Sequence, residues 1–344
     1  MEQSDSTPTR SASDTLWHSR TSIFRNIGKR LLSSNELGIL LVLILMVAFI
    51  GVYRPNFISI KSFSNVGQRA SWYGIMALGT VFLLSMGEID LSIGSNYAVC
   101  INAAAILMAE HGVNPWLAAL AGVLIGIGLG ALNGILANLF RLPAIIVTLG
   151  ALSMFRGMAL IISGGRFVYG VPREHQFFKT FGSDPLGVPL VIWAFVFLAI
   201  VLSVIYRSTR YGFIVRAIGS NSKAARMGGI PILRIRLYTL MLMGALCGIS
   251  AMLTLAFFST SDPQLGTGYE LQAIAAAIVG GTALSGGRGT VIGALLGAAV
   301  IAVIGSGITQ FGVSANYGTF VTGIVIIIAV GLDSVVRRRQ ARVG

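Results

Sequence analysis

A short polar interruption in a long apolar part of the chain holds the residues best suited to chemistry. It reads Gly87-Glu88-Ile89-Asp90-Leu91-Ser92-Ile93-Gly94. Isolated charges are costly in hydrocarbon, so carboxylates in such a setting face water, a cavity or a partner. One interpretation is a helix break that lines a path, with Asp90 or Ser92 capping the following helix. The other is a short connecting turn at a membrane surface. The candidate residues are Gly87, Glu88, Asp90, Ser92 and Gly94.

The longest hydrophilic stretch, Arg207–Arg236, contains no acidic residue. Within it, Asn221–Met227 favours a short helix that Ser220 or Asn221 caps and that Gly228-Gly229 ends. A compact helix between two membrane spans is suited to docking another protein. The alternative is a solvated loop whose charges only mark one side of a membrane.

Glycines are dense in Gly280–Gly289, directly after the apolar Ala273–Val279. Such a block lets backbones bend or approach closely. It lacks the phosphate-loop pattern GxxxxGK(S/T), and no lysine follows Lys223, so it predicts a packing or re-entrant element and not a nucleotide site. Its similarity to Leu84–Gly87, through Leu284–Gly287, is weak enough to be chance. The candidate residues are Gly280, Gly281, Gly286 and Gly287.

Arg156 is a lone cation inside an apolar run. A functional role, snorkelling, and pairing with Asp90 or with a backbone carbonyl all stay open. Other chemistry finds no support, because the histidines and the two cysteines are too scattered for a metal site. No HExxH, GxSxG or aspartate-pair motif indicates an intramembrane enzyme. The sequence therefore predicts no catalytic residue and no metal site.

The composition indicates that these residues belong to a protein embedded in a membrane. Of 344 residues, 55% are hydrophobic and 11% charged, whereas a soluble domain carries about 25% charged residues. The solvent is therefore largely lipid. The net charge of +13 comes from basic residues clustered at the N-terminus, in 207–236 and at Arg337-Arg338-Arg339. This clustering is typical of the cytoplasmic side of a membrane protein, so we expect a lipid bilayer and no nucleic acid as partner.

Apolar runs of about 20 residues predict an all-α integral membrane fold of about ten spans. We expect a cytoplasmic tail over 1–36, a transmembrane domain over 37–334 that includes the cytoplasmic segment 207–236, and a basic cytoplasmic tail over 335–344. Both termini then lie inside, although Arg54, Lys61 and Arg69 after the first span are an unexplained exception. The runs begin near Leu37, Ala70, Ile93, Trp116, Ala144, Val188, Leu237, Glu270, Thr290 and Thr319.

Four elements in order give the chain a resemblance to the monosaccharide-type permeases of bacterial ABC importers, the ribose, xylose and galactose class. They are Gly87–Gly94, the Arg216–Arg226 stretch, the Gly228-Gly229-Ile230 stop and the Gly280–Gly289 block. The resemblance implies a permease fold with broken or re-entrant helices in the bacterial inner membrane. It implies ATPase coupling through Arg216, Ala217, Ile218, Gly219, Ser220, Asn221, Ala224, Ala225, Arg226, Gly228, Gly229 and Ile230.

The same resemblance implies partners: ATP-binding cassette subunits on the cytoplasmic face, a periplasmic solute-binding protein, and a second permease copy in a homodimer or paired heterodimer. This chain is then no enzyme and binds no cofactor, because ATP and Mg are used by the partner ATPase. The cargo is a monosaccharide or similar small polyol. The rival is a secondary transporter driven by an ion gradient, for which Glu88 and Asp90 are nearly the only candidate coupling groups.

Two departures from the family pattern affect the site. Related permeases often have a second glycine where Glu88 stands, and the docking segment has Lys223 but no acidic residue before its two alanines. We expect Ala225→Glu to impair ATPase docking without abolishing membrane insertion, which co-purification of the cassettes would test. We expect Asp90→Ala to lower transport more than expression.

Overall fold

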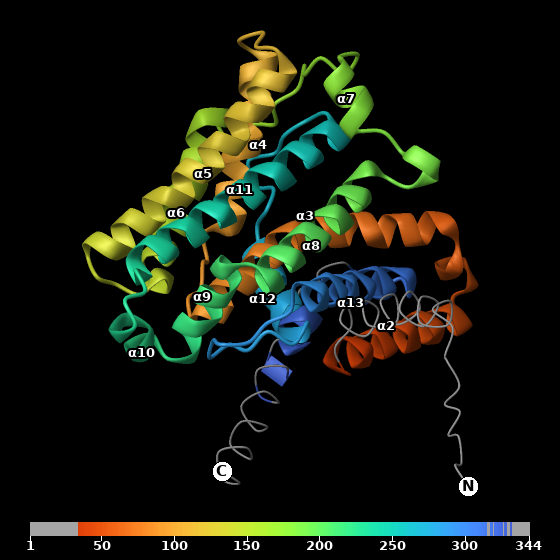
Figure 1. Ribbon diagram of the computed structural model, residues 1–344. Helices are drawn as coiled ribbons and strands as arrows, with labels where there is room; N and C mark the ends of the chain where they lie inside the picture. Colours follow the sequence, from red (N-terminus) through yellow and green to blue (C-terminus); the bar gives the residue numbers. More distant parts are fainter. Residues whose placement is uncertain (1–33, 315–316, 319, 326, 329–330, 332–344) are drawn as a thin grey trace, which may run out of the picture.

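The computed structural model describes residues 34–314, 317–318, 320–325, 327–328 and 331, and the regular elements in these residues are helical (Figure 1). The expected all-α fold is confirmed. The helices are α2 Ser34–Tyr53, α3 Ile60–Met86, α4 Ile93–Ala109, α5 Pro115–Leu139, α6 Ala144–Ser163, α7 Gln176–Phe181, α8 Leu190–Ser208, α9 Arg210–Ser220, α10 Ser222–Met227, α11 Ile232–Phe258, α12 Tyr269–Val279 and α13 Val291–Gln310, with 3-10 turns η1 Pro55–Ile58 and η2 Pro185–Gly187.

Six of the described helices are long and apolar enough to cross a membrane: α2, α5, α6, α8, α11 and α13. Every expected span except the last, near Thr319, corresponds to a described helix; the last falls on residues that are only partly described. The 11 residues of α12 rise only about 16 Å, about half the hydrocarbon thickness. Most of the two tails, 1–36 and 335–344, lies outside the described residues.

The second span begins earlier than expected. α3 starts at Ile60 and not near Ala70, and its 27 residues rise about 40 Å. Lys61 and Arg69 therefore are exposed side chains on the first half of a long helix and do not lie in a loop. Arg54 places its guanidinium 5.4 Å from the centre of the Phe311 ring. Arg54 thus packs against the end of α13, and Lys61 and Arg69 lie on the surface of α3.

The helices form two groups (Figure 1). One contains α4, α5, α6 and α11, and the other contains α2, α3, α8, α12 and α13; α3 joins them by packing against α11 as well. Helices α9 and α10 lie at one end of the spanning helices, here named the α10 side. The end that carries α7 is named the α7 side.

Small residues allow α5 and α11 to cross at close range. A Cβ atom on Gly126 would lie 2.3 Å from the carbonyl oxygen of Gly244, and one on Gly244 would lie 2.0 Å from the carbonyl oxygen of Gly126. Neither position admits a side chain, as is typical of tightly packed membrane helices. α11 is the central helix, since 72% of its most apolar window is buried, against 17% for α2.

Candidate functional site

The predicted interruption is a break between α3 and α4, and its polar side chains turn inward. α3 ends where Gly87 takes a left-handed conformation with φ of 80°. Asp90, 5% exposed, accepts hydrogen bonds from the amide of Ser92 at 2.8 Å and from its hydroxyl at 2.7 Å. The amide of Asn133 in α5 donates to the same hydroxyl at 2.8 Å. The break is therefore fastened to α5 inside the protein.

The expectation that Asp90 or Ser92 caps α4 with its side chain is wrong. Ser92 occupies the capping position, but its backbone is already helical, with φ of −86° and ψ of −4°, and no side-chain capping bond forms. A capping hydroxyl needs extended backbone geometry to reach the amides of the first turn. The Ser92 hydroxyl is instead engaged by Asp90 and Asn133.

Glu88 joins the break to the starts of two other helices. One carboxylate oxygen accepts the amide hydrogen of Ala144, in the first turn of α6, at 2.9 Å. The other forms an ion pair with Arg236, the fifth residue of α11. Both side chains are nearly enclosed, with exposed fractions of 11% for Glu88 and 16% for Arg236. A carboxylate is well placed here because the start of a helix carries partial positive charge.

Thr148 of α6 completes the attachment of the break. Its hydroxyl accepts the amide hydrogen of Leu91 at 3.1 Å. Farther along, Gly94 packs against the loop before α12, since a Cβ atom there would lie 2.2 Å from the carbonyl oxygen of Gly266. The sequence did not point to Thr148, Asn133 or Arg236 as partners, because each belongs to an element distant in the chain.

The segment predicted to dock another protein has the predicted local structure. α10 spans Ser222–Met227, and the Asn221 side chain caps it by accepting the amide hydrogen of Ala224 at 3.0 Å. Gly229, with φ of 78°, ends it, and the Ile230 amide closes back on the Ala225 carbonyl at 3.1 Å. The described side chains of α10 are exposed except that of Ala225.

Ala225 was therefore the wrong residue for a docking test. It is 7% exposed and belongs to the core, whereas Met227 is 89% exposed. A glutamate at position 225 would bury a carboxylate inside this chain, so any loss of docking could arise from damage to the fold.

The first part of the predicted coupling segment is internal structure. A Cβ atom on Gly219 would lie 1.9 Å from the carbonyl oxygen of Ser85, at the end of α3. The amide of Gly287 donates to that same carbonyl at 2.8 Å. Gly286, with φ of 86°, lets the loop turn into this contact. The ends of α9 and α3 and the glycine block thus meet at one point, here named the glycine junction.

Arg216 attaches α9 to the end of α8. Its guanidinium donates to the backbone carbonyl of Tyr206 and lies 4.8 Å from the centre of the Tyr206 ring. The Tyr206 hydroxyl is 2.7 Å from the hydroxyl of Ser85. Arg216, Ala217 and Ile218 are half-buried or buried with Gly219. These residues hold α9 in place, and Ser220 onward presents the outward surface.

The remainder of the glycine block packs within the chain. A Cβ atom on Gly280 would lie 2.4 Å from the backbone of Gly293 in α13, and Gly281 has φ of 88°. This agrees with the packing interpretation. The two similar segments, Leu84–Gly87 and Leu284–Gly287, are in contact, because both contribute to the glycine junction.

Arg156 bonds to backbone carbonyls and not to Asp90. One terminal nitrogen donates to Pro263 at 2.7 Å and to Leu265 at 3.0 Å, in the loop between α11 and α12. Of the possibilities left open by the sequence, carbonyl binding is the one observed. Arginine suits this role because it offers several donors in a fixed plane.

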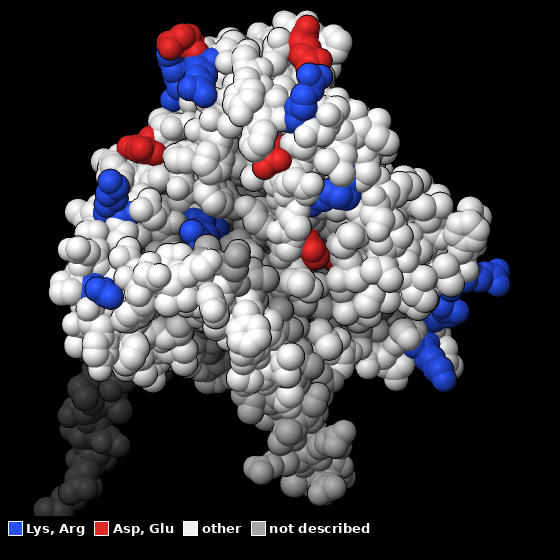
Figure 2. Space-filling model, turned by 180° about the vertical axis from the view of Figure 1, so that it is seen from behind, with Lys and Arg blue, Asp and Glu red and all other residues white. Residues whose placement is uncertain are grey.

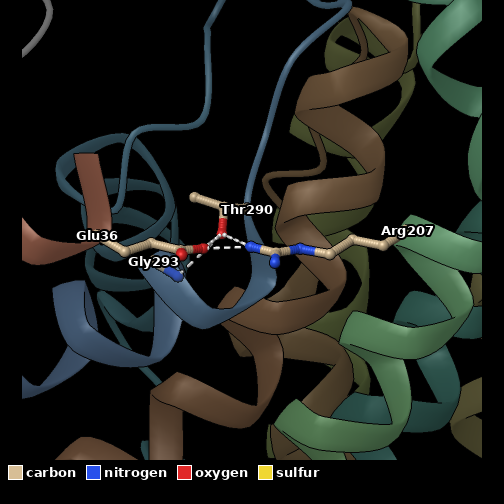
Figure 3. A network of polar contacts seen from close by, with 4 residues as sticks. All are labelled: Glu36, Arg207, Thr290 and Gly293. Carbon is tan, nitrogen blue, oxygen red and sulfur yellow. Dashed lines mark hydrogen bonds and ion pairs between the residues drawn. The ribbon is translucent and has the colours of Figure 1, made fainter. Parts of the chain in front are cut away.

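A polar network that the sequence did not indicate joins residues of α2, α8 and the start of α13 (Figure 3). Glu36 at the start of α2 forms an ion pair with Arg207 at the end of α8 and accepts a hydrogen bond from Thr290. Thr290 also caps α13 by accepting the Gly293 amide hydrogen at 3.2 Å. The network ties three helix ends together beside the segment that follows Arg207.

Sequence comparisons agree over most of the chain. The family described as "Branched-chain amino acid transport system / permease component" matches residues 62–330. The ribose import permease protein RbsC of Escherichia coli K12 is 33% identical over 297 residues, 86% of this chain and 92% of that protein. The L-arabinose ABC transporter permease protein AraH of Azospirillum brasilense is 31% identical over 309 residues, 90% of each chain. The D-allose transport system permease protein AlsC of Escherichia coli K12 is 32% identical, covering 88% and 93%.

Proposed function

This chain belongs to the permease components of the branched-chain amino acid transport family of ABC transporters, and from that premise we propose that it forms the membrane path of an ATP-driven monosaccharide importer. The observation that carries the proposal is similarity along nearly the whole length to permeases named for ribose, L-arabinose and D-allose. The chain is a multi-pass membrane protein and a transport subunit, not an enzyme.

The α10 side is proposed to be cytoplasmic. Basic side chains follow one another there without acidic ones in 207–236, which is the pattern of a cytoplasmic loop. ATP-binding cassettes would dock on the exposed face of α10, and a solute-binding protein would engage the α7 side. Both termini would lie in the cytoplasm of a bacterium, with the chain in the inner membrane. ATP and Mg would be bound by the cassettes and not by this chain.

The proposed coupling runs from α10 to the helix break by two contacts. The glycine junction connects α9 to the end of α3, immediately before Gly87. The Glu88–Arg236 ion pair connects the break to the start of α11, which follows α10 in the chain. A displacement of α10 by the cassettes would therefore reach the break from both sides.

The path itself is proposed to lie between two copies of the permease. Asp90 and Ser92 are buried among helices of their own chain, and two cavities found in the described residues are lined by neither of them. The helix break and Arg156 would then not line the path directly, but would hold in place the helices that line it. A homodimer and a pair with a related permease both satisfy this arrangement.

Reconstitution in liposomes tests the function. The permease is combined with its cognate cassette and solute-binding protein, and uptake of radiolabelled ribose, arabinose and allose is measured with ATP inside. We expect uptake of at least one sugar, dependent on ATP and on both partners, and none with an inactive cassette. Uptake that persists without the cassette and follows an imposed ion gradient would overturn the proposal in favour of a secondary transporter.

A further inference from the structure

A cavity of about 810 Å³ opens on the α10 side between the α5–α6 turn and the start of α11. Half of its lining residues are arginines. The lining consists of Arg141, Arg226, Ile230, Pro231, Ile232, Leu233, Arg234 and Arg236.

The positive charge of this cavity is largely uncompensated. Arg236 pairs with Glu88, but within the described part of the chain Arg141, Arg226 and Arg234 form no ion pair, and all three are exposed. The Arg236 Nε atom is buried and has no acceptor among the described residues. Figure 2 shows basic side chains gathered at the edge that carries α10 and the α5–α6 turn, without acidic side chains beside them on this face. The cavity therefore suits an anion.

Large apolar side chains lie exposed at the same helix ends. Leu139 and Phe140 at the end of α5 are 69% and 62% exposed, and Ile146 at the start of α6 is 54% exposed. On α11, Leu233 is 52% and Tyr238 54% exposed. Since α5, α6 and α11 are long and apolar enough to cross a membrane, these side chains would face hydrocarbon close to the arginines.

We propose that this cavity binds the phosphate headgroup of an anionic phospholipid, with the acyl chains lying on the exposed apolar side chains. Arginines recognise phosphate by paired, charge-assisted hydrogen bonds, and basic pockets between membrane helices on the cytoplasmic side suit anionic headgroups. A free phosphate would use the arginines but leave the apolar rim bare. An acidic protein surface would meet the outward face of α10, which supplies only Arg226 to the cavity. The proposal requires the membrane setting but not the identity of the cargo.

Lipid binding to the purified full-length chain tests this site. Binding of phosphatidylglycerol is compared with that of phosphatidylcholine of matched acyl chains, in neutral detergent, without cassettes. The variant R141Q/R234Q removes two charges that have no ion-pair partner in the described residues. We expect the native chain to bind phosphatidylglycerol more tightly than phosphatidylcholine. We expect the variant to bind phosphatidylglycerol about 25-fold more weakly than the native chain does, because each arginine near a membrane surface contributes about fivefold in affinity.

The matched control is R166Q/R173Q, which removes two exposed arginines from the loop between α6 and α7. It should bind phosphatidylglycerol as the native chain does. Equal binding of the two lipids by the native chain, or an unchanged affinity in R141Q/R234Q, would overturn the proposal. So would inorganic phosphate that displaces phosphatidylglycerol as well as unlabelled lipid does, because the site would then take a soluble anion. If the double variant aggregates, R234Q alone should show the fivefold loss, and its absence would count against the site.

Discussion

Glutamine at position 88 would keep the shape of the side chain but leave Arg236 without its carboxylate. Removing one partner of a fully buried ion pair costs about 3–5 kcal/mol. The two side chains retain exposed fractions of 11% and 16%, so water reaches part of the pair and we expect a smaller loss of about 2 kcal/mol. Glutamine can still accept the Ala144 amide hydrogen. The loss therefore reports on the charge, and what remains to Arg236 is the Leu142 carbonyl at 3.3 Å.

Thermal unfolding of the purified chain in detergent measures this effect. A loss of about 2 kcal/mol corresponds to a fall in Tm of about 3 °C for a chain of 344 residues. Glu88→Ala should lower the free energy of unfolding by about 1 kcal/mol more than Glu88→Gln does, because the Ala144 amide also loses its acceptor. The double variant Glu88→Gln/Arg236→Gln should recover more than half of the loss, since no buried charge is then left alone.

The refuting result is additivity. If the losses of Glu88→Gln and Arg236→Gln sum to that of the double variant, the two side chains do not interact. Glu174→Gln is the control for charge removal as such, because Glu174 and Lys179 form an exposed ion pair with side-chain exposures of 93% and 59%. Such a surface pair contributes at most about 1 kcal/mol, so its Tm should barely change.

Three further predictions concern other contacts. Leucine at Gly126 should separate α5 from α11 and cause aggregation in gel filtration, whereas leucine at Gly128 of the same helix, which has open space beside it, should be tolerated. Met227→Glu should lower co-purification of the cassettes about tenfold at unchanged Tm, whereas Ala225→Glu should lower Tm itself; the opposite pattern would place the docking surface elsewhere. Asp90→Ala should lower sugar uptake more than expression, and Asp90→Asn, which keeps an acceptor for the Ser92 hydroxyl, should lower it less; equal losses of uptake and expression would assign Asp90 to folding alone.

Local features of this site could be predicted from the sequence because neighbouring residues determine them. The short helix α10 follows from Asn221 as its cap and Gly228-Gly229 as its stop. The spans follow from apolar runs that no soluble fold would expose.

Long-range partners could not be predicted, because apolar periodicity says nothing about which helix ends meet. Glu88 could pair with any basic residue near the boundary, and only the packing of α11 brings Arg236 to it. The burial of Ala225 could not be predicted for a related reason. In a helix of six residues one face must rest on the protein, and the sequence of α10 is too short to show which.

The two proposed contacts between α10 and the helix break differ in how they respond to displacement. At the glycine junction the backbone of Gly219 packs directly against the backbone of Ser85, and the Gly287 amide donates a hydrogen bond to the Ser85 carbonyl. Sliding there would break a hydrogen bond and create steric overlap, so α9, the end of α3 and the glycine block should move as one body. The Glu88–Arg236 pair lies at the ends of two flexible side chains, which can remain paired while their helices shift. We therefore infer that a displacement of α10 reaches the break rigidly through the end of α3 and with more freedom through the Glu88–Arg236 ion pair.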